Sequence, residues 1–399
     1  MPQRALHVRK LGLVEYEDGL AMQKLLAAAR GAGAGADTLL LLEHPRVITL
    51  GRAAKAGNVL WSAAQLEARG FSLVETDRGG DVTYHGPGQL VGYPILDLKP
   101  DRKDVRRYVT SVEELMIRTA RDSGITAERV PGRPGIWVHR APAEGGLPRL
   151  GDEWEKLGAI GVHLSRWITT HGFAFNVSTQ LDDFRAIVPC GIQDAGVCSL
   201  ESLGAPAAMS AVEERAAQHG AAVWESEPFE IPIELETISL TIVREGLHGD
   251  ELLLLRRVPE RGGFWQTLTG KRERNEAALA AAARELYEET GFAPALDEIR
   301  ELNYAHSFAL DPSLMPGAAP GAGSSSDALD SAQRDSPRAP IFCRETAFAL
   351  RVEPSAEPRL EPREHDAHRW ASLEDALPLL PFAGLRRAAR LALEQLAAR

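Results

Sequence analysis

The sequence has few cysteines, no long apolar run and no excess of basic residues, and each of these features limits the class of protein. Three cysteines in 399 residues cannot build a disulfide framework, so we expect a reducing, cytoplasmic environment. No apolar stretch approaches the ~20 residues that span a bilayer. No apolar signal core follows the basic start Met1–Arg4. The sequence therefore predicts no membrane partner.

The charge balance is acidic and uneven. The formal net charge is -11; residues 1–228 hold 25 basic and 28 acidic side chains, and the remainder holds 20 and 28. This balance predicts no nucleic-acid partner. One local cluster is basic, and it consists of Lys99, Arg102, Lys103, Arg106 and Arg107. It suits either an acidic partner or the solvated start of a helix, and the sequence leaves both open.

The chain is too long for one ordinary core, and its pattern changes near residue 230. Residues 38–42 predict a buried strand, and Ser111–Ala120 predicts an amphipathic helix. Two prolines and mixed charge interrupt the pattern over Ser226–Pro232. A new strand pattern begins over Glu236–Val243, and Glu251–Arg257 reads as its hairpin partner.

These changes predict an α/β protein of two domains. We expect a first domain over residues 1–225, a linker over 226–235 and a second domain over 236–399. Asp311–Pro340 is rich in Gly, Ala, Ser, Pro and Asp and has almost no large apolar residue. We expect it to be a disordered insertion in the second domain, because it cannot bury enough apolar surface to order itself.

The segment Arg78–Gln89 is dense in glycine and predicts a loop that lines a site. Glycine permits backbone geometries and close approaches that side chains would block. Between the glycines stand Arg78, Thr83, Tyr84 and His85, which can donate hydrogen bonds to a carbonyl or a phosphate.

A candidate nucleophile follows downstream. Cys190 stands between Pro189 and Gly191, a turn-like setting from which a side chain can project into a cleft. A thiol is a weak nucleophile at neutral pH, and a nearby cation increases its thiolate fraction. Lys156 could supply that charge. Without further context, a lone cysteine is more often a small buried hydrophobe.

These residues resemble the lipoyl(octanoyl) transferase family. The resemblance runs from about Leu11 to Leu203. Its motifs are Leu41–Pro45, Thr49–Arg52, Arg78–Tyr93, Ser165–Trp167, His171–Val177 and Ile187–Ile192. The resemblance implies the α/β scaffold shared with biotin and lipoate ligases.

The resemblance also implies an activity and its residues. Octanoyl would pass from acyl carrier protein to a lysine on lipoyl domains of 2-oxoacid dehydrogenases and on the glycine cleavage H protein. Cys190 would carry it as a thioester, Lys156 would serve in acid-base transfer, and no cofactor would be needed. The implied substrate-binding residues are Arg78, Gly79, Gly80, Asp81, Val82, Thr83, Tyr84, His85, Ala159, Ile160, Gly161, Gly172, Phe173 and Ala174.

The second half carries a different chemistry. Residues 274–290 are rich in Ala, Leu and Glu and predict a helix that stops at Gly291. Glu285, Glu288 and Glu289 would share one face at positions i, i+3 and i+4. Carboxylates gathered in this way repel each other unless a cation neutralises them, and hard oxygen ligands suit Mg²⁺ or Mn²⁺.

The full spacing resembles the Nudix box. Gly270, Glu276 and the run Arg284–Phe292 stand at its defining intervals, and the resemblance covers about Glu236–Leu393. It implies an α/β/α sandwich that hydrolyses a nucleoside diphosphate linked to another group. Glu285 and Glu289 would be the main metal ligands, and Glu288 a ligand or the catalytic base. Many members have Gly where this chain has Asn275, which tolerates the same left-handed turn.

The Nudix substrate is less defined. Phe264–Gly270 and Glu364–His365 resemble the corresponding segments of bacterial dihydroneopterin triphosphate pyrophosphatases, which would make Glu364 a further metal ligand. These matches imply a pterin triphosphate; hydrolysis of nucleoside triphosphates is the competing interpretation.

Two other hypotheses compete with a bifunctional enzyme. The first half could be an ATP-dependent lipoate or biotin ligase, although such ligases need no acyl cysteine. The second half could be an idle sensor that binds a nucleotide and regulates the first, although its carboxylates are intact.

Overall fold

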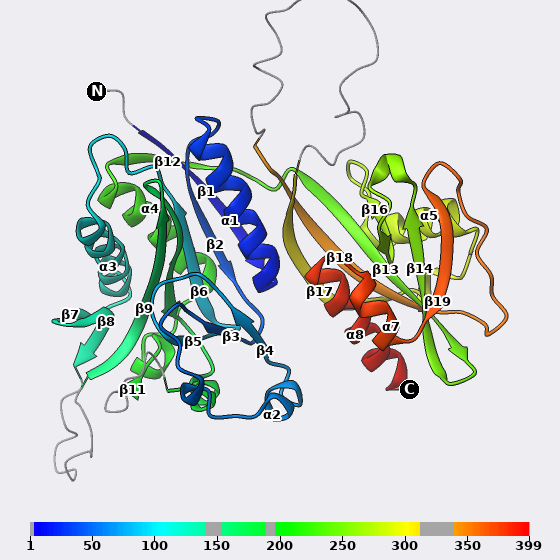
Figure 1. Ribbon diagram of the computed structural model, residues 1–399, viewed down its shortest axis with the longest axis horizontal. Coiled ribbons are helices and arrows are strands. Elements are labelled where there is room, and N and C mark those ends of the chain that lie inside the picture. The colour runs from blue at the N-terminus through cyan, green and yellow to red at the C-terminus, as the bar shows by residue number, and fades with distance from the viewer. Residues whose placement is uncertain (1–3, 140–153, 189–195, 312–338, 399) are drawn as a thin grey trace, which may run out of the picture. The chain divides into compact units, whose positions relative to one another are not determined.

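The computed structural model describes residues 4–139, 154–188, 196–311 and 339–398. It divides into two compact units, each described by itself below (Figure 1). The first comprises the chain up to Leu13 together with Gln23–Pro232, and the second comprises Val14–Met22 together with the chain from Ile233. No described helix is long and apolar enough to cross a bilayer. Most of the expected insertion 311–340 lies outside the described residues.

The described part of the first unit is built on a nine-stranded mixed sheet. The strand order is β12-β1-β2-β6-β10-β9-β8-β7, and β11 pairs with β9. The strands are β1 Arg4–Leu13, β2 Asp37–Glu43, β6 Gln89–Ile95, β7 Glu128–Val130, β8 Arg133–His139, β9 Trp154–Ser165, β10 Ile168–Asn176, β11 Gly196–Val197 and β12 Ser226–Glu230. The predicted strand over residues 38–42 is confirmed within β2, which is interior to the sheet and therefore buried on both faces.

Helices cover the two faces of this sheet (Figure 1). Helices α3 Val105–Arg121 and α4 Met209–Val223 pack on one face. Helix α1 Tyr16–Gly31 enters this unit at Gln23, and from there it lies on the other face. The helix predicted over Ser111–Ala120 is confirmed within α3. Its apolar side packs into the main core because the spacing places one stripe toward the sheet.

A second, smaller sheet completes the unit. It has the order β4-β3-β5, with β3 Val47–Leu50, β4 Ser72–Glu75 and β5 Val82–His85. The short helices α2 Ala63–Glu67 and η2 Leu181–Ala186 lie in the connections next to it. A satellite core that contains Tyr84, Phe71 and Phe184 holds this sheet together.

Residues 226–230, expected in a linker, instead form β12. This strand pairs in parallel with β1, and Pro228 lies opposite Leu6. The strand occupies the sheet edge, where a proline that cannot donate a hydrogen bond is tolerated. The sequence pattern missed it because the pairing joins segments more than two hundred residues apart.

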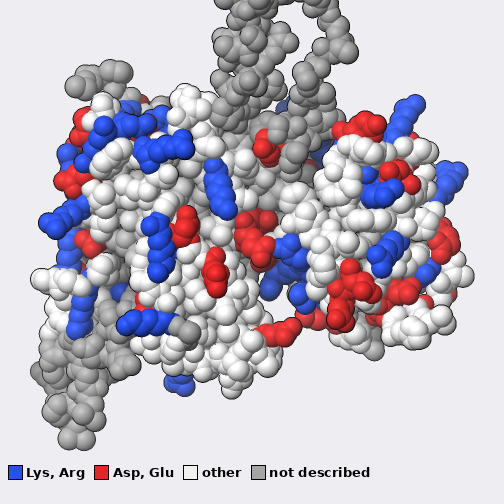
Figure 2. All heavy atoms as spheres, in the orientation of Figure 1, with Lys and Arg blue, Asp and Glu red and all other residues white. Residues whose placement is uncertain are grey.

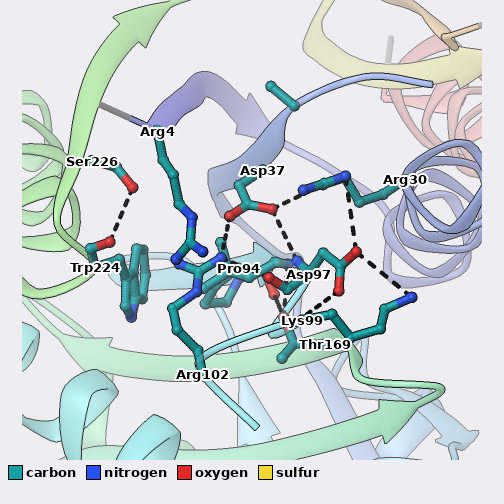
Figure 3. A network of polar contacts seen from close by, with 12 residues as sticks. Arg4, Arg30, Asp37, Pro94, Asp97, Lys99, Arg102, Thr169, Trp224 and Ser226 are labelled. Atoms are coloured by element: carbon teal, nitrogen blue, oxygen red, sulfur yellow. Dashed lines mark hydrogen bonds and ion pairs between the residues drawn. The ribbon is translucent and has the colours of Figure 1, made fainter. Parts of the chain in front are cut away.

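The basic cluster near α3 is partly internal (Figure 3). Arg102 donates from Nη2 to Asp37 Oδ2 at 2.7 Å and to the Asp97 carbonyl at 2.6 Å. Asp37 also accepts from Arg30 Nε at 2.9 Å. Arg102 therefore ties the sheet to the start of α3. On the face drawn in Figure 2, basic and acidic side chains are interspersed among the described residues.

The second unit is a seven-stranded sheet between helices. Its order is β15-β14-β13-β18-β17, with β16 paired to β13 and β19 to β14. The strands are β13 Leu235–Gly246, β14 Gly249–Arg257, β15 Trp265–Gln266, β16 Leu268–Lys271, β17 Arg300–Leu310, β18 Ile341–Arg351 and β19 His365–Ala371. The predicted hairpin is confirmed: β13 and β14 are antiparallel.

Two helices enclose this sheet. Helix α5 Ala278–Thr290 packs Ala281, Ala282 and Leu286 on the Ile238 face of β13, and α8 Ala383–Ala397 packs on the other. The short α7 Leu373–Ala376 precedes α8. The helix predicted from residue 274 begins only at 278. Asn275 there adopts a left-handed φ of 68°, which is incompatible with helix, so residues 274–277 form a turn instead.

Candidate active sites

Lys156 lies on β9 in an almost closed environment. Only 7% of its surface is exposed. Its Nζ lies over the ring of Trp137, 4.6 Å from the ring centroid. The two residues are partners across β8 and β9, so the sheet register itself sets this contact. The negative ring face favours an ammonium that is shielded from water.

A narrow pocket lies beside Lys156. It is lined by Thr83, Gln89, Lys156, Ala159, Ala174, Asn176, Phe184 and Val197. The structure thus brings the predicted catalytic lysine together with residues from the three segments predicted to bind substrate. Ala159 and Ala174 are partners across β9 and β10. Their small side chains leave space that larger ones would fill.

Strand alternation separates the predicted substrate-binding residues into two groups. Thr83 lies at the pocket, whereas Val82 and Tyr84, its neighbours on β5, belong to the satellite core. In the same way, Phe173 and Ile160 pack with the main core. Side chains on a strand point alternately to opposite faces, so a continuous sequence motif cannot line one pocket along its whole length.

Arg78 is buried, and its hydrogen bonds hold the glycine-rich loop against Thr49 of β3. Its Nε donates to Thr49 Oγ1 at 2.9 Å and its Nη2 to the Thr49 carbonyl at 2.7 Å. Gly79 lies against β9, where its N–H donates to the Val162 carbonyl at 3.0 Å. A Cβ on Gly161 would be 3.0 Å from the Gly79 carbonyl, so this close approach requires glycine. Gly172 is the partner of Gly161 on β10.

Asp81 connects the glycine-rich loop to the chain that leads toward Cys190. Its carboxylate accepts from the Asn58 amide and from the Lys55 N–H. The Gly80 carbonyl accepts from the Ala53 N–H at 3.0 Å. The Asn58 carbonyl then accepts from the Val188 N–H at 2.8 Å. The loop and the segment before Cys190 are therefore held by one set of contacts.

Cys190 itself lies outside the described residues, so its distance to Lys156 is not defined. The chain on either side is placed: Val188 contacts Asn58, and β11 resumes at Gly196. In β11, Val197 is the parallel partner of Lys156. The described chain after the cysteine segment therefore reaches the pocket through Val197, and the chain before it is held by Asn58.

A series of hydrogen-bonded polar side chains includes Gln89 and Asn176, which both line the pocket. His85 Nδ1 lies 2.7 Å from Gln89 Oε1, and Gln89 Nε2 donates to Asn176 Oδ1 at 3.0 Å. Asn176 Nδ2 donates to the Cys198 carbonyl at 2.9 Å. The Cys198 N–H in turn donates to the Lys156 carbonyl at 3.0 Å. The series links the glycine-rich segment to the backbone that carries Lys156.

His85 is neutral in this network. Burial, reinforced by the charge of His44, lowers the pKa of His85 to about 3. Because Gln89 offers its carbonyl oxygen, a neutral His85 carries its proton on Nδ1. The site therefore contains a fixed donor that does not titrate near neutral pH.

In the second unit, α5 carries the three predicted carboxylates. Glu289 is 6% exposed and lies 2.9 Å from His365 Nε2. Burial raises the pKa of Glu289, and the hydrogen bond with His365 opposes that shift. Glu285 packs against β16, where a Cβ on Gly270 would be 2.1 Å from its Cγ. Gly270 is thus required for the helix to approach the sheet.

Arg284 holds the acidic side chains around it. It donates to Glu276 at 2.9 Å, to Glu285 at 2.7 Å and to Glu288 at 3.2 Å. The contact between Arg284 and Glu288 joins positions i and i+4 of the helix. Hydrogen bonds from Arg284 lower the pKa of Glu276 to about 2. Glu276 also accepts from the Glu273 N–H at 2.8 Å, which closes the turn before α5.

The donor chemistry of this site fits a hard divalent cation. Burial raises the pKa of Glu285, and the neighbouring Glu289 and Glu288 raise it further, a repulsion that a bound cation would relieve. In the described chain, however, no three such side chains gather closely enough to hold a metal. Glu364 is paired with Arg261, and Glu289 with His365. These partners occupy carboxylate oxygens that a metal would need.

Several residues at the two sites were not predicted to act there. Gln89 and Asn176 were read only as parts of a motif, and Phe184 and Val197 carried no signal. A polar residue on a strand otherwise made of apolar ones could have identified Asn176. His365 and Arg261 could be found only from tertiary contacts, because they lie far from α5 in the chain.

Family models match both halves of the chain. The lipoyl protein ligase A/B catalytic domain matches residues 15–220, and the NUDIX domain matches residues 237–392. The chain is 48% identical over 381 residues to an octanoyltransferase of Myxococcus xanthus, which is 95% of this chain and 96% of that protein. It is also 48% identical over 220 residues to an octanoyltransferase of Solibacter usitatus, covering 55% of this chain and 93% of that one.

Solved structures resemble each half at low similarity. A bi-partite lipoate protein ligase from Thermoplasma acidophilum gives a TM-score of 0.44 at 16% identity, over 58% of this chain and 88% of that chain. The E. coli dihydroneopterin triphosphate pyrophosphohydrolase gives 0.30 at 22% identity, over 40% and 95%. The expected fold class, a ligase-like α/β domain followed by a Nudix domain, is confirmed by the family models.

Proposed function

The chain belongs to the octanoyltransferase family and carries a Nudix hydrolase domain as its second half, and from this premise we propose the chemistry of each site. The first site moves octanoyl from acyl carrier protein to a lysine of lipoyl domains, through a thioester on Cys190. The second hydrolyses a nucleoside or pterin di- or triphosphate with Mg²⁺ or Mn²⁺. Both reactions take place in the cytoplasm.

The transfer takes place in two steps, acylation of Cys190 and then transfer to the acceptor lysine. The Cys190 thiolate attacks the thioester carbonyl of the carrier, and the carrier thiol leaves with a proton from Lys156. The acceptor amine then attacks the Cys190 thioester, Lys156 takes the proton from the amine, and the Cys190 thiolate leaves. Exchange of one thioester for another is close to neutral in energy, so no ATP is consumed.

The observation that carries this proposal is the position of Lys156. It is the ionisable side chain among the residues that line the pocket, and Val197 from the strand after the cysteine segment lies beside it. Ala159, Ala174 and Phe184 give the pocket an apolar lining, which matches the chemistry of an acyl chain.

Mass spectrometry of the intact protein tests the transferase. We expect an octanoyl adduct after incubation with octanoyl-acyl carrier protein, without ATP, and its absence in Cys190→Ser. Lys156→Gln should slow adduct formation at least ~100-fold, since acid-base transfer contributes 10²–10⁴. Cys198→Ser is the control and should keep the adduct. Adduct formation that requires ATP would favour the ligase hypothesis.

The proposed hydrolase site has residues that would bind the metal and residues that would orient those ligands. Glu285, Glu288, Glu289 and Glu364 would hold the metal, and Arg284 and Arg261 would release carboxylate oxygens as it binds. When bound, the metal supplies charge neutralisation of the diphosphate and activation of water. His365 fixes Glu289 in one orientation through the 2.9 Å contact.

The hydrolase is tested by Mg²⁺-dependent release of diphosphate. Glu289→Gln should reduce the rate at least ~100-fold, because it removes a buried ligand charge. Glu301→Gln, an exposed position on β17, is the matched control and should be unchanged. Comparing kcat/KM for dihydroneopterin triphosphate with that for nucleoside triphosphates separates the two substrate classes. Equal rates in Glu289→Gln and the wild type would exclude the metal assignment.

A further inference from the structure

The first unit has a second pocket, outside the acyl site, that the transfer chemistry does not use. It has a volume of about 340 Å³ and is lined by Arg46, Trp61, Arg69, Phe71, Asp182, Asp183 and Arg185. Three guanidinium groups therefore surround two aromatic rings and two carboxylates. Arg46 precedes β3, Trp61 precedes α2, and Arg69 and Phe71 lie between α2 and β4. The remaining three residues belong to η2. Figure 1 shows α2 and β4 at the small sheet.

The charged side chains of this pocket differ in whether they already have a partner of opposite charge. Asp183 is 13% exposed and its Oδ2 accepts from Arg46 Nε at 2.8 Å and from Tyr84 at 2.7 Å. Asp182 pairs with Arg185 at 3.1 Å at the surface. Arg69 lies over the Trp61 ring, 4.7 Å from its centroid. Within the described chain, no carboxylate forms an ion pair with Arg69.

The surroundings have the composition of a protein-binding surface. Tryptophan and arginine are enriched among residues that dominate binding energy, and charged pairs at the rim steer the encounter. Two large apolar side chains that neighbour these residues in the sequence are exposed. Leu60, directly before Trp61, is 56% exposed, and Leu73, two residues after Phe71, is 47% exposed. Apolar exposure beside an arginine and aromatic cluster favours a protein over a small anion.

The pocket is joined to the acyl site through η2. Phe184 of this element lines the acyl pocket, while its neighbours Asp183 and Arg185 line the second pocket. The chain then reaches Val188, two residues before Cys190, which is at most about 7 Å of extended backbone. A partner that contacts Arg185 in the second pocket is therefore three residues along the chain from Val188, where this described segment ends.

We propose that this surface, made of Arg46, Trp61, Arg69 and Arg185, docks the acyl carrier protein through acidic side chains of that protein. The inference rests on the proposed transferase function. The other protein substrate, the lipoyl domain, brings a cationic lysine to the site, and the net positive charge here would repel it. The carrier brings a thioester, which has no such charge.

The test compares donors in the Arg69→Glu variant. We expect the KM for octanoyl-acyl carrier protein to rise at least ~10-fold with kcat little changed, because lost charge complementarity weakens the encounter. Turnover of octanoyl-pantetheine, which has neither carrier protein nor phosphate, should be unchanged, as should the KM for the lipoyl domain. The KM for the carrier should also depend less on salt than in the wild type.

Arg106→Glu, in the exposed first turn of α3, is the matched control and also tests the rival basic cluster. An equal effect of both variants, or an effect of Arg106→Glu alone, would overturn the proposal. A rise in the KM for the lipoyl domain would assign the surface to the acceptor instead. An equal loss with octanoyl-phosphopantetheine would assign it to the phosphate of the donor arm.

Two further results complete the test. Trp61→Ala, with unchanged thermal unfolding, should raise the same KM, since it removes the ring beneath Arg69. If the wild type transfers octanoyl from neither donor, the proposed function fails; if it transfers from both and Arg69→Glu behaves as the wild type, only the docking surface fails.

Discussion

At the scale of single residues, Asn176 satisfies two partners at once. Its carbonyl oxygen accepts from Gln89 and its amide donates to the Cys198 carbonyl, next to the backbone of Lys156. An asparagine can do both because it carries a donor and an acceptor on one short side chain. Its role is to position the strand that holds Lys156 against β11.

Asn176→Asp keeps the acceptor and loses the donor, which leaves the Cys198 carbonyl without this bond. We expect the first unit to lose about 1–3 kcal/mol of stability and kcat for octanoyl transfer to fall more than KM changes. Asn303→Asp makes the same chemical change at an exposed position on β17 and should leave both unchanged. Urea unfolding and steady-state kinetics measure these effects, and a variant that matches Asn303→Asp would contradict the positioning role.

His85 should make the first unit sensitive to acid. Its pKa of about 3 in the folded protein lies below the ~6.5 of an unfolded chain. The unfolded state therefore binds more protons between these values, so stability present above pH ~6.5 is lost as the pH falls toward 3, by about 1.4 kcal/mol per pH unit.

His85→Gln should remove this part of the pH dependence. We expect the unfolding free energy of the variant to fall less than that of the wild type between about pH 7 and about pH 5. Differential scanning calorimetry over this range measures the difference. Parallel curves for the two proteins would show that His85 is not held neutral by the fold.

At the scale of elements, the turn before α5 depends on one backbone conformation. Asn275 has a φ of 68°, which costs most L-residues about 1–2 kcal/mol. Asn275→Gly should therefore be neutral within about 0.5 kcal/mol, while Asn275→Ala should destabilise the second unit by about 1 kcal/mol or more. Thermal unfolding of the two variants measures this, and equal stability would contradict the strain argument.

Elements with a strong local pattern could be predicted from the sequence, and elements that depend on distant contacts could not. The buried strand at residues 38–42 and the carboxylate face of α5 follow from composition and spacing. The start of α5 was misplaced because the left-handed backbone of Asn275 ends the turn before the helix, and the helix-forming composition of residues 274–277 does not show this. Strand β12 was missed because only β1 reveals it.

In the candidate sites, too, local patterns predicted some features, and distant contacts determined the rest. The residues of each motif were identified, yet which of them face the pocket depends on strand alternation and register. Thr83 and Ala174 reach it, while Tyr84 and Phe173 belong to cores. The polar chain through Gln89 and Asn176 joins positions 87 residues apart, and no local pattern predicts such a pair.

At the scale of the whole molecule, the two proposed reactions differ in their need for a divalent cation in solution. The proposed acyl transfer uses no metal, whereas the carboxylates of α5 have the donor chemistry for one. Removal of divalent cations with EDTA should abolish diphosphate release and leave octanoyl transfer within about two-fold of its rate. Added Mg²⁺ should restore the first activity. Parallel loss of both activities would contradict the separation of the two sites.

The ring of Trp137 beneath the Lys156 ammonium has a practical consequence. Indole fluorescence responds to charge held against its face, and this charge changes whenever Lys156 gives up or takes a proton. If Lys156 exchanges a proton with the substrates as we propose, Trp137 reports that exchange optically and needs no added label. We expect the emission of Trp137 to change at each step of the proposed acyl cycle in which Lys156 gains or loses a proton.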